Sequence, residues 1–259
     1  PASLASMLLA KSYAATIFGE IANTEYQGEI SGQSDKVVIN TVPNIAIRDY
    51  VAGQNLQYDV PVGATVELLI DQGKYFGFRL NDVLEHQSKP ALMNVFSDDA
   101  AQQMKVVIDR SVLLGTFNKA DAANMGATAG KISGAYNLGT DAVPVVLTGA
   151  NILQTITSLS SVLDEQNVPE TDRFLVISPS ERQILMQSNL AQAQFMGDST
   201  SMQRNGKIGM IDRFTVYVST HLPRPAADVN FTGGPQAVSA NLSPIIAVHP
   251  TPHTLASTP

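Results

Sequence analysis

The sequence contains no cysteine and no tryptophan among its 259 residues. The absence of cysteine excludes disulfide frameworks, thiolate zinc sites and cysteine nucleophiles. Charged residues make up only 15% of the chain, below the roughly 25% typical of soluble proteins. A chain with so few charges either buries much of its surface or presents neutral surface to partners. Both conditions fit a protein that works inside an assembly.

Clusters of positive charge are also missing. The net charge is −7 and no run of five basic residues occurs, which argues against a dedicated nucleic-acid reader. The longest apolar stretches, such as residues 142–147, are far too short to span a bilayer. Residues 7–10 lack the basic start and the cleavage pattern of a signal peptide. We therefore expect a cytoplasmic start and no membrane partner.

Histidine is scarce, and its spacing does not indicate a metal site. The chain has four histidines, at positions 86, 221, 249 and 253. His249 and His253 would share one face of a helix, but Pro250 and Pro252 exclude a regular helix there. We interpret this segment as a polar loop or an edge strand, without metal ligands.

Motifs that carry catalysis are missing as well. The chain has no G-x-S-x-G elbow, no H-E-x-x-H helix and no Walker phosphate loop. Asp98 and Asp99 are adjacent on an expected helix, so their carboxylates point about 100° apart and do not converge on one substrate. Asp164 and Glu165 lie at a helix end, and we interpret both acidic pairs as solvated. We predict no catalytic residue, no cofactor and no metal ligand.

The first part of the chain favours one helix followed by extended segments. Residues 3–22 have a mostly apolar helical pattern. Strands are expected at 36–40, 44–50, 65–71 and 74–80. The residues Asp71-Gln72-Gly73-Lys74 form a turn signal between the last two strands. The region between 28 and 63 is marked by Gly and Pro, and it cannot make much core alone. An arm that reaches to a neighbouring molecule is a natural use for it.

A change of period marks a long helix after residue 88. Ser88-Lys89-Pro90 has the composition of a helix start. Apolar residues then recur at steps of three and four, namely Leu92, Phe96, Ala100, Met104, Val107, Ile108 and Val112. Asp109 falls off that stripe. A helix that ends near Asn118 would be about 40 Å long, which suits a spine that crosses the whole molecule.

The second half favours a mixed region of helices and strands. Residues 119–147 are small and weakly patterned, which indicates loops. A helix is predicted from a cap at Thr148 to a stop before Pro169, and another from the capping box Ser178-Pro179-Ser180-Glu181 to about Ser188. Asn205-Gly206 is a hairpin-turn signal. Strands are expected at 174–177, 214–219 and 244–248.

Three stretches of this sequence resemble the major capsid proteins of tailed bacteriophages, which have the Hong Kong 97-type fold. The first stretch runs from Ile47-Arg48-Asp49-Tyr50 to the segment TVELLIDQGKYFGFRLNDV at 65–83. The second joins LDEQNVP at 163–169 to RFLVISP at 173–179. The third joins RNGKIGMI at 204–211 to FTVYVS at 214–219 and Leu222-Pro223. The likeness covers nearly the whole chain, and the order of the stretches makes it specific. One departure is Arg213, where many relatives have Gly.

This resemblance implies an α+β fold with an N-terminal arm, an extended β-hairpin called the E-loop, a P-domain with a long spine helix, and an A-domain. The implied boundaries are 1–27 for the arm, 28–88 for the E-loop and its supporting strands, 89–120 for the spine helix, 121–242 for the A-domain, and 243–259 for the C-terminal strand that returns to the P-domain. Some relatives cross-link a Lys to an Asn between subunits. Lys36 and Lys74 lie in the matching region, but nothing marks a catalytic carboxylate beside them, and we do not predict that chemistry.

The implied function is structural. Copies of the chain would pack as hexamers and pentamers into the icosahedral phage head, assembled in the bacterial cytoplasm. The head would enclose double-stranded DNA without sequence-specific contact. Scaffolding protein, portal and a decoration protein are the other implied partners. Two alternatives stay open. An encapsulin-like compartment has the same fold and encloses enzymes. A hydrolytic or binding enzyme of mixed α/β type would need a convergent polar pocket, which no motif supplies.

Overall fold

The computed structural model of the chain divides into two compact units. The larger unit comprises Pro1–Ala22 and Tyr75–His253, and the smaller unit comprises Asn23–Lys74 and Thr254–Pro259. The structure describes residues 13, 15–22, 36–43, 45–63, 65–69, 73–79, 92–140, 143–188, 209–223 and 244–250.

A four-stranded mixed sheet lies at the centre of the larger unit, with strand order β4-β5-β3-β6. β3 (Arg173–Ile177) pairs in parallel with β5 (Phe214–Val218) and antiparallel with β6 (Ile246–Val248). β4 (Met210–Ile211) pairs antiparallel with β5. The strands predicted at 174–177, 214–219 and 244–248 are therefore confirmed.

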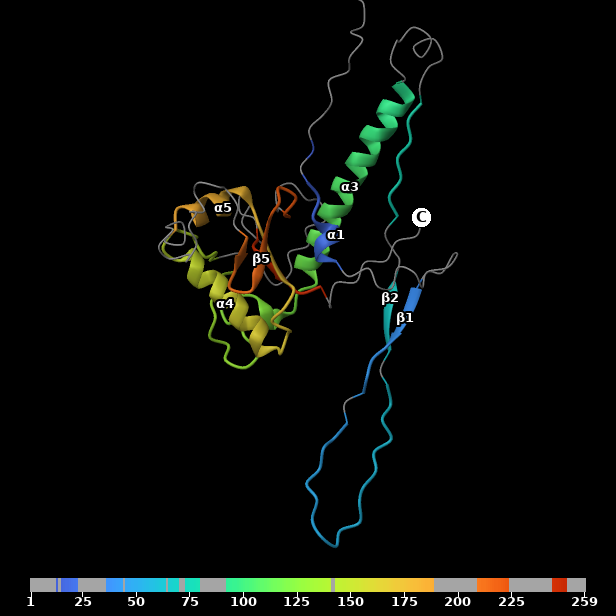
Figure 1. Cartoon of the computed structure of the whole chain (residues 1–259), viewed down its shortest axis with the longest axis vertical. Coiled ribbons are helices and arrows are strands. Elements are labelled where there is room, and N and C mark those ends of the chain that lie inside the picture. Colours follow the sequence, from blue (N-terminus) through green and yellow to red (C-terminus); the bar gives the residue numbers. More distant parts are fainter. Residues whose placement is uncertain are drawn as a thin grey trace, which may run out of the picture. The chain divides into compact units, whose positions relative to one another are not determined.

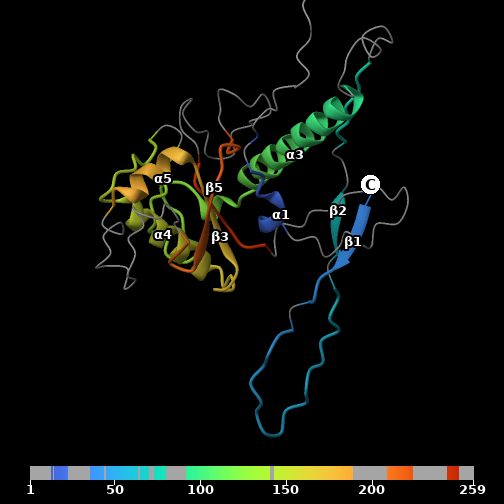
Figure 2. The ribbon, with the colours of Figure 1, turned by 45° about the horizontal axis from the view of Figure 1, so that its top comes forward.

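Helices cover both faces of this sheet, because successive residues of β3 point to opposite sides. Leu175 and Ile177 pack against α4 (Ile152–Glu165) and α5 (Pro179–Met186). Val176 faces the other way and packs with Leu113 of the long helix α3 (Leu92–Asn118) and with the short helix α1 (Phe18–Ile21). Figure 2 shows α4 and α5 beside β3 and β5, with α1 and α3 on the other side.

The capping box of α5 forms as predicted. The Ser178 hydroxyl accepts a hydrogen bond from the Glu181 amide at 3.5 Å, and the Ser178 amide donates to the Glu181 carboxylate at 2.5 Å. The predicted cap of α4 at Thr148 is wrong, because the helix begins at Ile152 and Asn151 occupies the capping position. The Asn151 side chain accepts from the Thr148 amide at 2.7 Å, so these residues form a turn ahead of the helix.

The long helix α3 spans Leu92–Asn118, and its predicted end is confirmed. Its buried face, however, differs from the predicted stripe. The buried positions described in α3 are Asp109, Leu113 and Thr116, whereas Phe96 is 39% and Val107 is 45% exposed. Residues 88–90, the predicted helix start, lie outside the described residues. The described residues between 119 and 147 are mostly loop, as predicted, and include one 3-10 turn, η2 (Ala122–Asn124).

The predicted helix over residues 3–22 is wrong in its described part. Only α1 (Phe18–Ile21) is helical there, and residues 13 and 15–17 are not. The reason is tertiary, since the Asp109 carboxylate accepts hydrogen bonds from the amides of Ile17 and Phe18. The remaining residues of the predicted helix lie outside the described residues.

The smaller unit contains a two-stranded ladder and a long loop. β1 (Lys36–Asn40) pairs antiparallel with β2 (Thr65–Leu69), and the ladder ends at the pair Asn40 and Thr65. Residues 45–50 and 73–79 form no strand. The strands predicted at 44–50 and 74–80 are therefore wrong in their described parts, and the partner of β2 is β1. In Figure 1 the chain between β1 and β2 runs out and back as an open hairpin.

Candidate assembly surfaces

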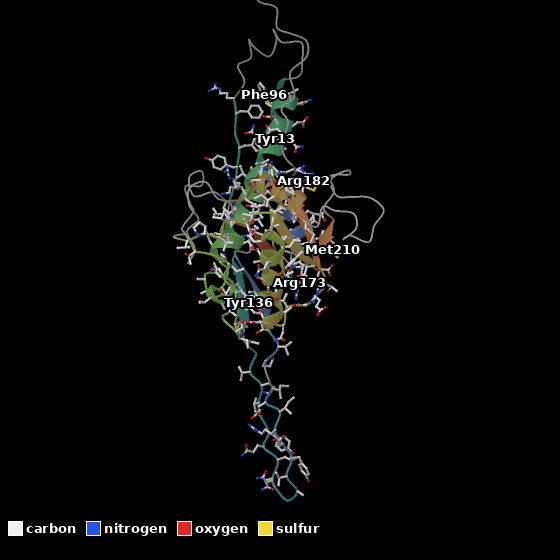
Figure 3. All side chains as sticks on the ribbon, turned by 90° about the vertical axis from the view of Figure 1, so that its left-hand side faces the viewer. Tyr13, Phe96, Tyr136, Arg173, Arg182 and Met210 are labelled. Carbon is white, nitrogen blue, oxygen red and sulfur yellow. The ribbon has the colours of Figure 1, made fainter. Side chains whose placement is uncertain are left out.

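The hairpin formed by residues 41–63 exposes an unusual amount of apolar surface. Nine of its large apolar side chains are 56–99% exposed, namely Val42, Ile45, Ile47, Tyr50, Val51, Leu56, Tyr58, Val60 and Val62. Contiguous exposed apolar surface on a protein marks sites of contact with other molecules. Figure 3 shows the side chains of this hairpin projecting from the ribbon.

One limb of the hairpin has a two-residue alternation. Leu56, Tyr58, Val60 and Val62 occupy the even positions, so in extended chain they line one face. Opposite them, the Arg48 guanidinium spans the two limbs, donating to the Gln57 carbonyl at 3.3 Å and to the Asp59 carboxylate at 2.9 Å. This clamp fixes how the limbs face each other.

The two limbs enclose an opening of about 580 Å³. Its lining combines apolar side chains such as Val42, Ile45 and Val60 with the charged pair Arg48 and Asp59. The hairpin is therefore held in register by the Arg48 clamp and has little packing of its own.

A second apolar surface lies on the first half of α3. A hollow of about 260 Å³ is lined by Phe76, Phe78, Phe96, Asp99 and Gln103, together with Gly77 and Ala100. The rings of Phe78 and Phe96 meet edge to face with centroids 5.9 Å apart, and both remain 39–42% exposed. Figure 3 places Phe96 near the end of α3, and Tyr13, which belongs to the N-terminal segment, is labelled beside the helix. The apolar stripe identified from the sequence thus lies partly at the surface.

The histidines considered as metal-ligand candidates occupy positions within the packed subunit where these are described. His221 binds the buried carboxylate of Asp109 through Nδ1 at 2.6 Å, and His249 is buried just after β6. His86 and His253 lie outside the described residues. Within the described part of the chain, no three His, Asp or Glu residues come together as metal ligands would.

The two acidic pairs differ from the prediction that both are simply solvated. Asp98 is exposed, but Asp99 accepts hydrogen bonds from the Tyr13 hydroxyl and from Gln103, the latter at 2.7 Å. Asp164 accepts from Arg173 at 2.7 Å. Each of these carboxylates holds segments of the subunit together through its own hydrogen bonds.

Glu165 fixes the loop that precedes α4. Its carboxylate accepts hydrogen bonds from the amides of Ile132 at 2.9 Å and Ser133 at 3.1 Å. The hydrogen bond from the Ser133 side chain, followed by that from the Ile132 amide, lowers the pKa of Glu165. Gly130 at φ +110° lies against this carboxylate, where a Cβ atom would come within 2.8 Å of it. The glycines of the 119–147 region were the available signal for this close turn.

The comparison with protein families decides the identity. The family model described as phage capsid protein matches residues 65–255, well over half of the chain. The chain belongs to the phage capsid protein family. The role of this capsid protein is therefore structural, and its location is the phage head.

Solved phage structures have the same fold as this capsid protein. One from Mycobacterium phage Che8 matches with a TM-score of 0.70 and 25% identity over 86% of this chain and 76% of that one. The capsid structure of cyanophage P-SCSP1u matches with a TM-score of 0.66 and 16% identity over 94% and 75%. The asymmetric unit of the bacteriophage PhiM1 mature capsid matches with a TM-score of 0.60 and 16% identity over 94% and 77%.

These matches identify the α+β architecture as the Hong Kong 97-type capsid fold, which confirms the predicted fold class. A search of curated protein sequences found no match. None of the described helices is long and apolar enough to cross a membrane.

Proposed function

We propose that this protein is the major capsid protein of a tailed phage, and that its copies form the icosahedral head around double-stranded DNA. The observation that carries the proposal is the hairpin 41–63, whose nine large apolar side chains are more than half exposed. A single subunit gains nothing from that exposure. Burial between copies gives the large apolar contacts typical of obligate assemblies, and closed symmetry repeats each contact around the shell.

The proposed division into functional parts follows the implied boundaries. Residues 1–27 form the arm, 28–88 the E-loop with its supporting strands, and 89–120 the spine helix of the P-domain. The A-domain spans 121–242, and 243–259 returns to the P-domain. The contacts of β6 support the last assignment, because Ile246 and Val248 pack in the same cluster as Leu113 of α3.

The proposed partners are chiefly other copies, arranged as hexamers and pentamers, with the E-loop lying over a neighbouring subunit. Scaffolding protein, portal and a decoration protein complete the set. The net charge of −7 supports a wall that encloses DNA without gripping it. Assembly takes place in the host cytoplasm, and the proposed role includes no enzymatic activity.

Replacing the hairpin tests the proposal. β1 and β2 end opposite each other at Asn40 and Thr65, so residues 41–64 can be exchanged for Asn-Gly, which forms a two-residue turn between antiparallel strands. We expect the shortened protein to keep its helical circular dichroism and thermal unfolding but to form no shells by negative-stain electron microscopy. The matched control keeps the hairpin and changes Gln54 and Gln57 to Ser, and it should assemble.

The outcome separates the competing functions. Normal shells from the shortened protein would show that the hairpin is not the contact between copies. A wild-type protein that remains a compact monomer under all assembly conditions would overturn the capsid role itself. Shells isolated from cells with enclosed enzymes and no DNA would instead identify a compartment of the encapsulin type.

A further inference from the structure

Asp109 is a fully buried carboxylate on α3, four residues before Leu113 of the apolar cluster that α3 forms with the sheet. Burying a charge is costly unless hydrogen bonds replace the water that it loses. Oδ1 accepts from the amides of Ile17 at 3.0 Å and Phe18 at 2.8 Å, and Oδ2 accepts from Nδ1 of His221 at 2.6 Å. A carboxylate oxygen accepts hydrogen bonds from amides, and the imidazole Nδ1 completes the set of partners around Asp109.

The three partners belong to segments far apart in the sequence. Ile17 and Phe18 begin α1, and His221 follows β5. The His221 segment is itself anchored, because the His221 amide donates to the Ser219 hydroxyl at 3.1 Å and the Ser219 amide donates to the Ile177 carbonyl of β3 at 3.0 Å. Asp109 therefore ties the N-terminal segment to both the spine helix and the sheet.

A second carboxylate of α3 holds the same N-terminal segment farther along. The Tyr13 hydroxyl donates to Asp99, which Gln103 also binds at 2.7 Å. From Tyr13 to Ile17 an extended chain covers about 13 Å, and from Asp99 to Asp109 the helix rises about 15 Å. The two lengths agree, so residues 13–17 run alongside α3 with one hydrogen-bonded contact near each end.

Apolar packing alone does not give this arrangement. Ile17 and Ile21 are buried beside Leu113, but apolar burial has no direction and tolerates sliding and rotation. Hydrogen bonds fix both distance and angle. Two adjacent amides on one carboxylate oxygen determine where α1 begins and how Ile17 and Phe18 are oriented toward α3.

We propose that Asp109, supported by His221, is the positioning residue that holds the N-terminal segment at Ile17 and Phe18 against α3, and that shell assembly requires this latch. The proposal rests on the capsid function for its assembly part. Its structural part holds for the unassembled subunit by itself. Asp109 acts through Ile17 and Phe18 and is not itself a contact between copies.

Three variants test the latch. Asp109→Leu keeps a similar volume and leaves the two amides and His221 without their acceptor. Asp109→Asn retains an oxygen for the amides, and its NH₂ group can donate to an unprotonated Nδ1 of His221, so it should behave as a rescue. Asp98→Asn, at an exposed position of the same helix, is the matched control.

The readout is hydrogen–deuterium exchange of unassembled subunits by mass spectrometry, followed by electron microscopy. We expect Asp109→Leu to speed exchange in peptides covering residues 13–22 by at least tenfold and to prevent closed shells. Peptides covering β3 should exchange as in the wild type. Asp109→Asn should stay within about threefold of the wild type and should assemble, as should Asp98→Asn.

Unchanged exchange over residues 13–22 in Asp109→Leu would overturn the latch. Normal shells from that variant would overturn its role in assembly. If Asp109→Leu does not fold, His221→Leu is the alternative test, because it removes only one of the partners of Asp109. It should raise exchange over the same peptides several-fold, and an unchanged rate would overturn the proposal. If the wild type forms no shells, the capsid function fails while the exchange result still decides the latch.

Discussion

Arg173 is fully buried at the start of β3, and its hydrogen bonds explain why a charge is tolerated there. Nε donates to the Pro169 carbonyl at 2.8 Å, and one terminal nitrogen donates to both the Val168 carbonyl and the Asp164 carboxylate at 2.7 Å. The other terminal nitrogen lies 3.4–3.5 Å from oxygens of Ser160. One side chain thereby fixes the loop that joins α4 to β3.

Replacing Arg173 with Met should therefore destabilise the subunit. We expect Arg173→Met to lower the free energy of unfolding by about 3 kcal/mol, because buried carbonyls lose their donor while Asp164 regains contact with water. Urea unfolding of the unassembled protein measures the loss. Lys119→Met, at an exposed loop position, is the control and should cost less than about 0.5 kcal/mol. Equal midpoints for the two variants would contradict this assignment.

The surroundings of Arg213 show why this position can hold Arg where relatives have Gly. Asp212 and Arg213 link β4 to β5 with φ of +43° and +67°, the left-handed conformation of a tight hairpin turn. Glycine adopts it without steric cost, whereas Arg does not. In exchange, the Arg213 guanidinium pairs with Glu170 at 3.2 Å and with Asp164 at 3.5 Å.

Substitutions at position 213 should separate backbone from charge. Arg213→Gly loses two exposed ion pairs of little energetic weight and relieves the backbone, so stability should change by less than about 1 kcal/mol. Arg213→Val loses the same pairs and puts a β-branched residue at positive φ, which should cost about 2 kcal/mol. Thermal unfolding of both variants makes the comparison. A larger loss of stability in the Gly variant than in the Val variant would show that the ion pairs of Arg213 matter more than its backbone conformation.

Glu165 should contribute a pH-dependent part of stability. Its pKa in the folded protein lies below the ordinary value of 4.5, so the folded state favours the ionised form. The contribution is complete above the ordinary pKa and is lost as the pH falls through the lower folded value. Between neutral pH and acid, the wild type should therefore lose more thermal stability than Glu165→Gln. Identical pH profiles for the two proteins would rule out this role.

At the scale of elements, α3 is divided in function along its length. The buried positions described for it, such as Asp109 and Leu113, lie in the half that covers the sheet. The other half exposes Phe96 and Met93 beside the hollow formed with residues 76–78. One half thus belongs to the core of the subunit, and the other half is available to a neighbouring molecule.

Two substitutions should show this division. Leu113→Ala creates a cavity in the core and should lower the free energy of unfolding by 2–5 kcal/mol. Phe96→Ser removes an exposed ring and one edge-to-face contact, which should cost about 1 kcal/mol, yet it should reduce the yield of shells in assembly assays. Calorimetry of subunits and light scattering during assembly report the two effects separately. Normal assembly by Phe96→Ser would remove this surface from the interface.

The elements that the sequence predicted correctly carry their signal locally. The capping box at Ser178, the apolar run of β3 and the end of α3 each depend on a few adjacent residues. The wrong predictions depend on distant partners. α1 begins only at Phe18, where the amides of Ile17 and Phe18 donate to Asp109. β2 pairs with β1 instead of with residues 74–80. The burial of Asp109 could not be predicted, because Asp109 lies off the apolar stripe and its partner His221 is 112 residues away in the sequence.

At the scale of the whole molecule, thiol labelling can measure which surfaces become buried when subunits assemble. It contains no cysteine, so a single introduced thiol has no competitor. We expect Val60→Cys, on the apolar face of the hairpin, to react readily with a maleimide in subunits, because Val60 is 87% exposed, and at least tenfold more slowly in shells. Lys119→Cys is the control that tests whether assembly slows the reaction of the maleimide at a position outside the hairpin. Equal rates for Val60→Cys in both states would contradict burial of this face.

The one-sided anchoring of α3 has a mechanical consequence. From Leu113 to Met93 the helix rises about 30 Å, and a tilt of about 5° at the buried end moves the far end by about 2.6 Å over that length. A shift too small to disturb the packing on the sheet is thereby amplified beyond the tolerance of a hydrogen bond at the other end. If that exposed end contacts a neighbouring subunit, repacking inside one subunit would displace the contact surface, and α3 would act as a lever arm.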